Sequence, residues 1–153
     1  MALSLSPIQF KESKLLYLSF DDTRLEGSSV LYSDEAAPTS GERFYTLSVD
    51  RKLEYTESED TLTCMGSLRF SWEIKGSDED DSPIIATVEG AMGACSTCPS
   101  RMGDPDTVRK TLAANTLSYI WSKLRVIVEQ LSSQACIGSL SLPAIDPIAL
   151  AED

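Results

Sequence analysis

The chain is 153 residues long, 42% of its residues are hydrophobic, and its formal net charge at pH 7 is -11. This length and composition predict a single domain over residues 1–153, and no apolar run approaches the ~20 residues that a membrane span requires. The negative charge argues against nucleic acid binding, and the absence of histidine excludes Ser/His/Asp and Cys/His catalytic arrangements and every histidine-containing metal site.

The first residues, MALSLSPIQFKE, contain neither the basic start nor the long apolar stretch of a secretory signal, so we expect a cytoplasmic protein. The segment of residues 8–20 predicts a strand with Leu16, Leu18 and Phe20 on one face and with Leu15 and Tyr17 on the other. Since both faces carry apolar side chains, we expect this strand to be buried on both sides.

Residues 21–42 form a connection that is long for a compact domain, and it contains the apolar residues Val30, Leu31 and Tyr32 in polar surroundings. A crossing from one edge of the sheet to a later strand would explain this length. The apolar residues are either incidental to a flexible loop or part of an exposed hydrophobic contact surface.

Two long amphipathic strands come next. Residues 45–55 alternate apolar and polar side chains, and residues 62–74 place an apolar or small residue at every second position. The polar sequence TESED between them predicts a hairpin, so the two strands are expected to be antiparallel neighbours. Residues 84–94 predict a further strand, in which Gly90 and Gly93 favour a bend or a bulge.

The chain has four cysteines, and Cys64 and Cys136 lie in apolar patterns that are typical of core positions. Cys95 and Cys98 form a single C-x-x-C sequence, with neither a second C-x-x-C to complete a zinc site nor the βαβ context of a redox pair. Three interpretations stay open for this pair: a structural role, half of a metal site shared between subunits, or redox chemistry. We expect no cofactor and no metal site within one chain.

Residues 104–135 predict one long helix. Asp104 is a favourable N-cap and Pro105 suits the first helical position, whereas Gly138 and Pro143 prevent continuation. At about 100° per residue, two apolar stripes fall on opposite sides of this helix. The wide stripe consists of Leu117, Ile120, Trp121, Leu124, Val128 and Leu131, and the narrow stripe of Leu112, Tyr119 and Val126. Because one stripe is enough to cover the subunit's own sheet, the narrow stripe predicts an oligomer interface.

Together these elements predict an α+β fold, a four-stranded antiparallel sheet packed against one long helix and followed by a short tail. Their order and several local sequences resemble the SecB-type export chaperones and the related SecB-like chaperones of toxin–antitoxin systems. YLSF resembles the first strand of that family, YTLSVDRKLEY and LRFSWEI its central hairpin, and IIATVEGAMGA its fourth strand. YIWSKLRVIVEQLSS resembles its long helix, and GSLSLPAIDP the connector before a short second C-terminal helix.

The resemblance covers residues 8–147 and implies a non-enzymatic, ATP-independent holdase that keeps unfolded or newly made polypeptides soluble. It also implies a homotetramer built as a dimer of dimers. Exposed apolar grooves suit this activity because unfolded chains expose apolar side chains and unpaired backbone groups. The client-binding residues that it implies are Val30, Leu31 and Tyr32 in the crossing, Leu140 and Leu142 in the connector, and Ile145, Ile148 and Leu150 in the tail.

The chain departs from the export chaperones at the acidic surface with which they meet the SecA motor. Asp21 falls in the matching area, but Tyr17 and Thr87 stand where acidic residues are expected. These departures weaken the case for docking on SecA. They leave two kinds of client open, exported preproteins and a dedicated antitoxin.

Two other functions fit the sequence. One is a thiol or metal protein centred on Cys95 and Cys98, which thiol titration and metal analysis would identify. The other is an adaptor that binds one folded partner through the edges of its sheet. Competition by unrelated unfolded chains would distinguish such an adaptor from a holdase.

Overall fold

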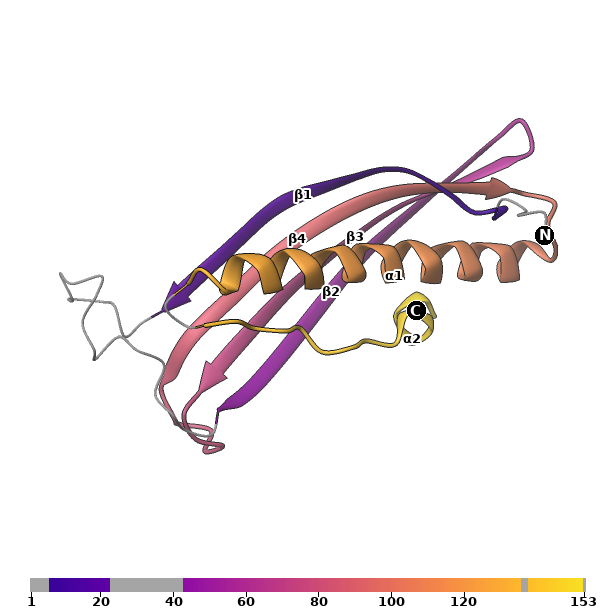
Figure 1. Cartoon of the computed structure of the whole chain (residues 1–153). Coiled ribbons are helices and arrows are strands. Elements are labelled where there is room, and N and C mark those ends of the chain that lie inside the picture. Colours follow the sequence, from indigo (N-terminus) through magenta and orange to yellow (C-terminus); the bar gives the residue numbers. More distant parts are fainter. Residues whose placement is uncertain (1–5, 23–42, 136–137, 153) are drawn as a thin grey trace, which may run out of the picture.

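The computed structural model describes residues 6–22, 43–135 and 138–152 (Figure 1). These residues form the strands β1 (Gln9–Asp22), β2 (Phe44–Ser58), β3 (Thr61–Lys75) and β4 (Ile84–Pro99), followed by the helices α1 (Pro105–Ser132) and α2 (Pro147–Ala151). The predicted α+β fold, with a four-stranded antiparallel sheet, one long helix and a short second helix, is confirmed.

The strands lie in the order β1-β4-β3-β2, and every neighbouring pair is antiparallel. β2 and β3 form the predicted hairpin around Glu59 and Asp60, whose positive φ angles of 50° and 63° are those of a tight two-residue turn. β1 pairs with β4, so β1 and β2 form the two edges of the sheet. The predicted crossing between these edges, with Val30, Leu31 and Tyr32, lies outside the described residues.

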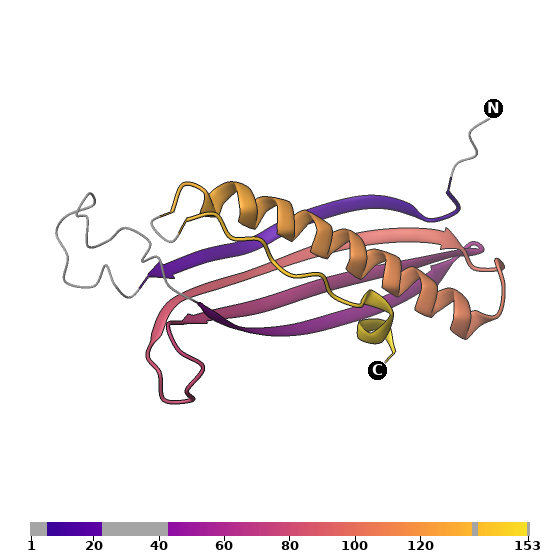
Figure 2. The ribbon, with the colours of Figure 1, turned by 60° about the horizontal axis from the view of Figure 1, so that its bottom comes forward.

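The domain has two layers. α1 lies along one face of the sheet, and the segment that follows it runs back beside α1 to α2 (Figures 1 and 2). The core between the layers contains the predicted inward residues of β3, including Leu68, Phe70 and Ile74, and the T-shaped ring pair of Phe70 and Trp121. No helix among the described residues is long and apolar enough to cross a membrane.

The residues of the predicted wide stripe from Leu117 to Val128 are buried, but the buried surface of α1 is broader than this stripe. Deeply buried residues also recur at every fourth position from Val108 to Ser132, through Leu112, Thr116, Ile120, Leu124 and Val128, and Ala113 is buried beside this ridge. Each step of four residues advances the direction of the side chain by about 40°, so this ridge turns along the helix and ends at Ser132, which contacts Leu140 in the segment after α1. The prediction of the wide stripe is therefore wrong at Leu131, which is 44% exposed, and that of the narrow stripe is wrong at Leu112, which is fully buried.

The prediction that β1 is buried on both faces is also wrong. β1 is an edge strand whose residues are exposed or half-buried, because α1 covers the sheet mainly over β3 and β4. Its register against β4 shifts between Phe10 and Glu12 and again between Leu15 and Tyr17. The second shift places Leu15 on the same face as Leu18, which explains the apolar residues on both predicted faces.

β4 keeps its register with β3 at both predicted glycines, whereas its pairing with β1 shifts at Met92 and Ala91, between Gly90 and Gly93. Gly90 makes room for core side chains. A Cβ atom there would lie 2.7 Å from Cε1 of Phe70 and 3.0 Å from Cδ1 of Leu18. A Cβ atom at Gly93 would come no closer than 3.5 Å to any atom, the carbonyl oxygen of Gly66.

We predict that Gly90→Ala lowers the free energy of unfolding by about 1–3 kcal/mol, because the added methyl group overpacks the core against Phe70. The control Gly93→Ala has space for its methyl group and restricts the unfolded chain, so it should raise that free energy by about 0.4–1 kcal/mol. Urea denaturation of both variants measures the difference. Equal stability of the two variants would contradict the packing at Gly90.

Candidate functional site

The connector, residues 139–143, is an extended segment. Three side chains of α1 hold it in place by hydrogen bonds to its backbone. The indole Nε1 of Trp121 donates a hydrogen bond to the carbonyl of Pro143 at 2.8 Å, and Nε of Arg125 donates to the carbonyl of Leu142 at 2.9 Å. The backbone amide of Leu140 donates to Oγ of Ser132 at 2.8 Å. The connector is thus held along α1 without belonging to a helix or a strand.

Serine and leucine alternate in the connector, and this alternation decides which of its side chains are exposed. Leu140 and Leu142 are 4% and 0% exposed and belong to the subunit's own core, whereas Ser139 and Ser141 are exposed. Leu140 and Leu142, which the resemblance implies as client-binding residues, therefore do not present their side chains to a client in this structure. Their spacing of two in an extended segment turns both toward the core and anchors the connector.

A hollow of about 450 Å³ lies between the connector and the end of β2. Its lining consists of Tyr45, Leu47, Trp72, Ser139, Leu140, Ser141 and Pro143. The ring of Tyr45 is 48% exposed, and its centroid lies 5.0 Å from that of the buried Trp72. The hollow therefore combines an exposed aromatic surface with serine hydroxyls and extended backbone, which suits an extended peptide with apolar side chains.

The hollow was not predicted as a site, although Tyr45 and Leu47 were recognised as alternating residues of a strand. Their role depends on β2 being an edge strand that begins beside the connector. An edge strand keeps one side of its backbone unpaired by the sheet, so it can accept an added strand. Nothing in the local sequence distinguishes an edge strand from a central one.

The tail places the three predicted client residues in different surroundings. Asp146 caps α2 by accepting hydrogen bonds from the amides of Ile148 and Ala149 at 3.0 and 3.3 Å. Ile145 and Leu150 are half-buried against the main core, while Ile148 is 62% exposed. Ile148 lines a second hollow, of about 240 Å³, between α2 and the first half of α1.

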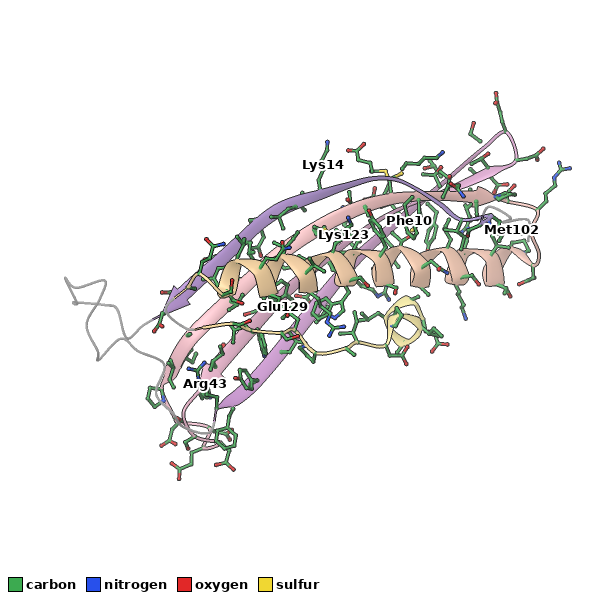
Figure 3. All side chains as sticks on the ribbon, viewed as in Figure 1. Phe10, Lys14, Arg43, Met102, Lys123 and Glu129 are labelled. Carbon is green, nitrogen blue, oxygen red and sulfur yellow. The ribbon has the colours of Figure 1, made fainter. Side chains whose placement is uncertain are left out.

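The predicted interface stripe of α1 is only partly exposed. Leu112 is buried against Leu62 and Val108, so it is not available to an interface with another subunit. Val126 is 52% exposed. Tyr119 is half-buried and stacks on Phe10 of β1 with ring centroids 4.2 Å apart, and Phe10 points from β1 toward α1 in Figure 3.

Both cysteines of the C-x-x-C sequence lie in the strand β4, which directs their side chains to opposite faces of the sheet. Positions three apart in a strand point to opposite faces, so Cys95 is partly exposed on the face away from α1, whereas Cys98 is buried beneath α1. Burial raises the pKa of the Cys98 thiol and that of Cys64. This geometry opposes a site that uses both Cys95 and Cys98. Cys136 lies outside the described residues.

Comparison with known proteins finds similarity in structure but not in sequence. No family model and no curated protein matches the chain. The Mycobacterium tuberculosis Rv1957 SecB-like chaperone, solved in complex with a ChAD peptide from the Rv1956 HigA1 antitoxin, superposes with a TM-score of 0.54 and 16% identity over 90% of each chain. A Streptococcus agalactiae protein of unknown function superposes with a TM-score of 0.52 and 9% identity, over 90% of this chain and 97% of the other. The chain therefore has a SecB-like fold.

We predict that Ser132→Ala loosens the connector. The substitution leaves the amide of the buried Leu140 without its hydrogen bond, which should lower the free energy of unfolding by about 1–3 kcal/mol. Ser133→Ala is the control, since its exposed hydroxyl contacts only the carbonyl of Gln130 and its loss should change that free energy by less than about 0.5 kcal/mol. Urea denaturation and hydrogen exchange at Leu140 measure both effects, and unchanged exchange would contradict this anchoring.

We predict unequal reactivity of the described cysteines toward iodoacetamide at about pH 8. Cys95 should react first, because it is partly exposed, while Cys64 and Cys98 should react slowly, because burial limits access and their raised pKa values reduce the thiolate fraction. The rates of these two thiols should continue to rise above pH 9, where unperturbed thiols are largely ionised. Peptide mapping by mass spectrometry follows each cysteine separately. Rapid modification of Cys98 in the native protein would contradict its burial.

Proposed function

We propose that this protein is an ATP-independent holdase that binds extended segments of unfolded or newly made polypeptides in the cytoplasm. The observation that carries the proposal is the hollow between the connector and β2, where Tyr45 is exposed beside an edge strand. The SecB-like fold supports it, because the similar Rv1957 chaperone was solved with an antitoxin peptide. The client is an exported preprotein or a dedicated antitoxin.

The chemistry of the hollow fits such clients. An unfolded segment offers aromatic and aliphatic side chains, which would pack on Tyr45 and Pro143. It also offers backbone groups, which would pair with the outer edge of β2, where no other described strand lies. Ile148 on α2 and Val30, Leu31 and Tyr32 in the crossing are proposed as further apolar contacts. The net charge of -11 would keep the empty protein soluble and would attract basic clients.

We also propose that the protein assembles as a homotetramer, a dimer of dimers, through the outer side of α1 around Tyr119 and Val126. A second subunit placed there would cover the apolar surface of Val126, which is 52% exposed. Docking on SecA is not part of this proposal, because Tyr17 and Thr87 stand where the export chaperones carry acidic residues. Neither nucleic acid nor membrane insertion is involved.

Suppression of aggregation tests the proposed function. A chemically denatured client is diluted into buffer without ATP, and light scattering is followed with and without stoichiometric amounts of this protein. We expect Tyr45→Ser to weaken suppression several-fold, because it removes the exposed ring of the hollow. Tyr17→Ser is the matched control, since this tyrosine is 39% exposed on the face of the sheet away from α1.

Sedimentation of the same samples tests the assembly. The double variant Tyr119→Glu with Val126→Glu should have a lower mass than the wild type, because it places charges in the proposed apolar interface. A wild-type monomer that does not suppress aggregation at stoichiometric ratio would refute both proposals. Suppression that unrelated unfolded chains fail to compete away would instead indicate an adaptor for one partner.

A further inference from the structure

The face of the sheet away from α1 carries a hollow that the proposed function does not use. It has a volume of about 470 Å³ and draws its lining from all four strands, including Lys14, Lys52, Met65 and Gly93. Lys14 points away from α1 in Figure 3. No helix formed by the described residues covers this face (Figures 1 and 2).

The register of the strands arranges the lining residues in two parallel rows. In one row Lys14 pairs with Gly93, Gly93 with Ser67, and Ser67 with Lys52. In the other row Glu12 pairs with Cys95, Cys95 with Met65, and Met65 with Glu54. One row therefore has a lysine at each end and the other has a glutamate at each end. The rows are two residues apart along the strands, or about 6.8 Å.

The central residues of the two rows protrude from the sheet to different extents. Met65 in the glutamate row is 55% exposed and stands beside Cys95. Gly93 and Ser67 in the lysine row have no side chain and a short one, so they form a low floor next to it. Each row thus carries the charge and the shape that would fit the other row.

We propose that this surface binds the same surface of a second copy of the chain, face to face. A twofold axis that lies parallel to the rows and midway between them brings each row opposite the other row of the second copy. Lys14 and Lys52 of each copy then face Glu12 and Glu54 of the other, and each Met65 faces the floor at Ser67. This association does not depend on the proposed client binding.

The charges of the surface favour this occupant. Lys14 Nζ lies 2.9 Å from Glu12 Oε1, and Lys52 Nζ lies 2.9 Å from Glu54 Oε1, with all four side chains largely exposed. Within one copy, each of these lysines has one neighbouring glutamate among the lining residues. In the face-to-face pair, each lysine would lie between two carboxylates, one from each copy. Networks of this kind contribute more than isolated surface pairs.

The rows on either side of the hollow are compatible with the same twofold axis. Arg69 and Asp50 pair across β2 and β3 in the row beyond the lysines, and Thr63 and Thr56 pair in the row beyond the glutamates. The axis places Arg69 opposite Thr63 and Asp50 opposite Thr56. No like charges meet in these rows, so the complementarity extends past the hollow itself.

Sedimentation velocity over a range of protein concentrations at low salt tests the proposal. The double variant Lys14→Glu with Lys52→Glu should weaken association at least about tenfold, because it makes both rows negative. The fourfold variant that adds Glu12→Lys and Glu54→Lys keeps the wild-type composition and exchanges the two rows, so it should restore association. High salt should weaken association of the wild type and of the exchanged variant alike.

Gly93→Val tests the shape of the surface independently of charge. A Cβ atom at Gly93 meets no atom closer than 3.5 Å, so the fold should tolerate valine while the floor is filled and association is lost. The wild type should then have about twice the mass of this variant or more at high protein concentration. Equal masses of the wild type and Gly93→Val, or failure of the exchanged variant to associate, would overturn the proposal.

The outcome separates this surface from the client site. If Gly93→Val leaves the mass unchanged but weakens suppression of aggregation, the surface holds a client peptide and the proposed association is refuted. If Gly93→Val lowers the mass and leaves suppression intact, the face-to-face association stands, and the test with Tyr45→Ser decides the proposed function separately.

Discussion

The packing of one buried ridge of α1 on the sheet is the contact on which the other features depend. Residues four apart form this ridge, which packs on the sheet at Leu112, Ile120 and Leu124 and meets the connector at Ser132. Because this ridge rotates by about 40° at each step, the side of α1 that is free to contact other segments also changes along its length. Trp121, Arg125 and Ser132 can therefore reach the connector, while Val126 stays exposed.

Polar contacts give this apolar packing a defined register. Ser96 of β4 and Thr116 of α1 are fully buried, and their hydroxyl groups form a hydrogen bond with each other; Thr116 also donates to the carbonyl of Leu112 at 2.7 Å. A buried hydroxyl without a partner is costly, so sliding the helix by one turn would break this pair. At the other end of the ridge, Ser132 fixes Leu140. This last contact positions Leu140, which lines the hollow beside Tyr45.

The elements of the fold could be predicted from local patterns, but the exposure of several residues could not. Alternation identified β2 and β3, and the cap at Asp104 identified the start of α1, since both signals depend on neighbours in sequence. Helical periodicity alone places Leu112 on the side opposite the wide stripe, whereas in the structure it is buried against Leu62 and Val108. The local sequence does not reveal that Leu140 and Leu142 are buried, because their burial depends on distant residues of the main core.

The sequence alone determined the α+β architecture, the long capped helix and the acidic character of the chain, because each follows from periodicity, capping or composition. Only the tertiary structure decided that β2 is an edge strand, that the connector runs beside it, and that Cys95 and Cys98 face opposite sides of the sheet. It also decided that the two pairs of Lys and Glu residues form complementary rows. The physical reason is that strand order and register bring together residues that are far apart in the chain. Local sequence patterns do not indicate which strands become neighbours.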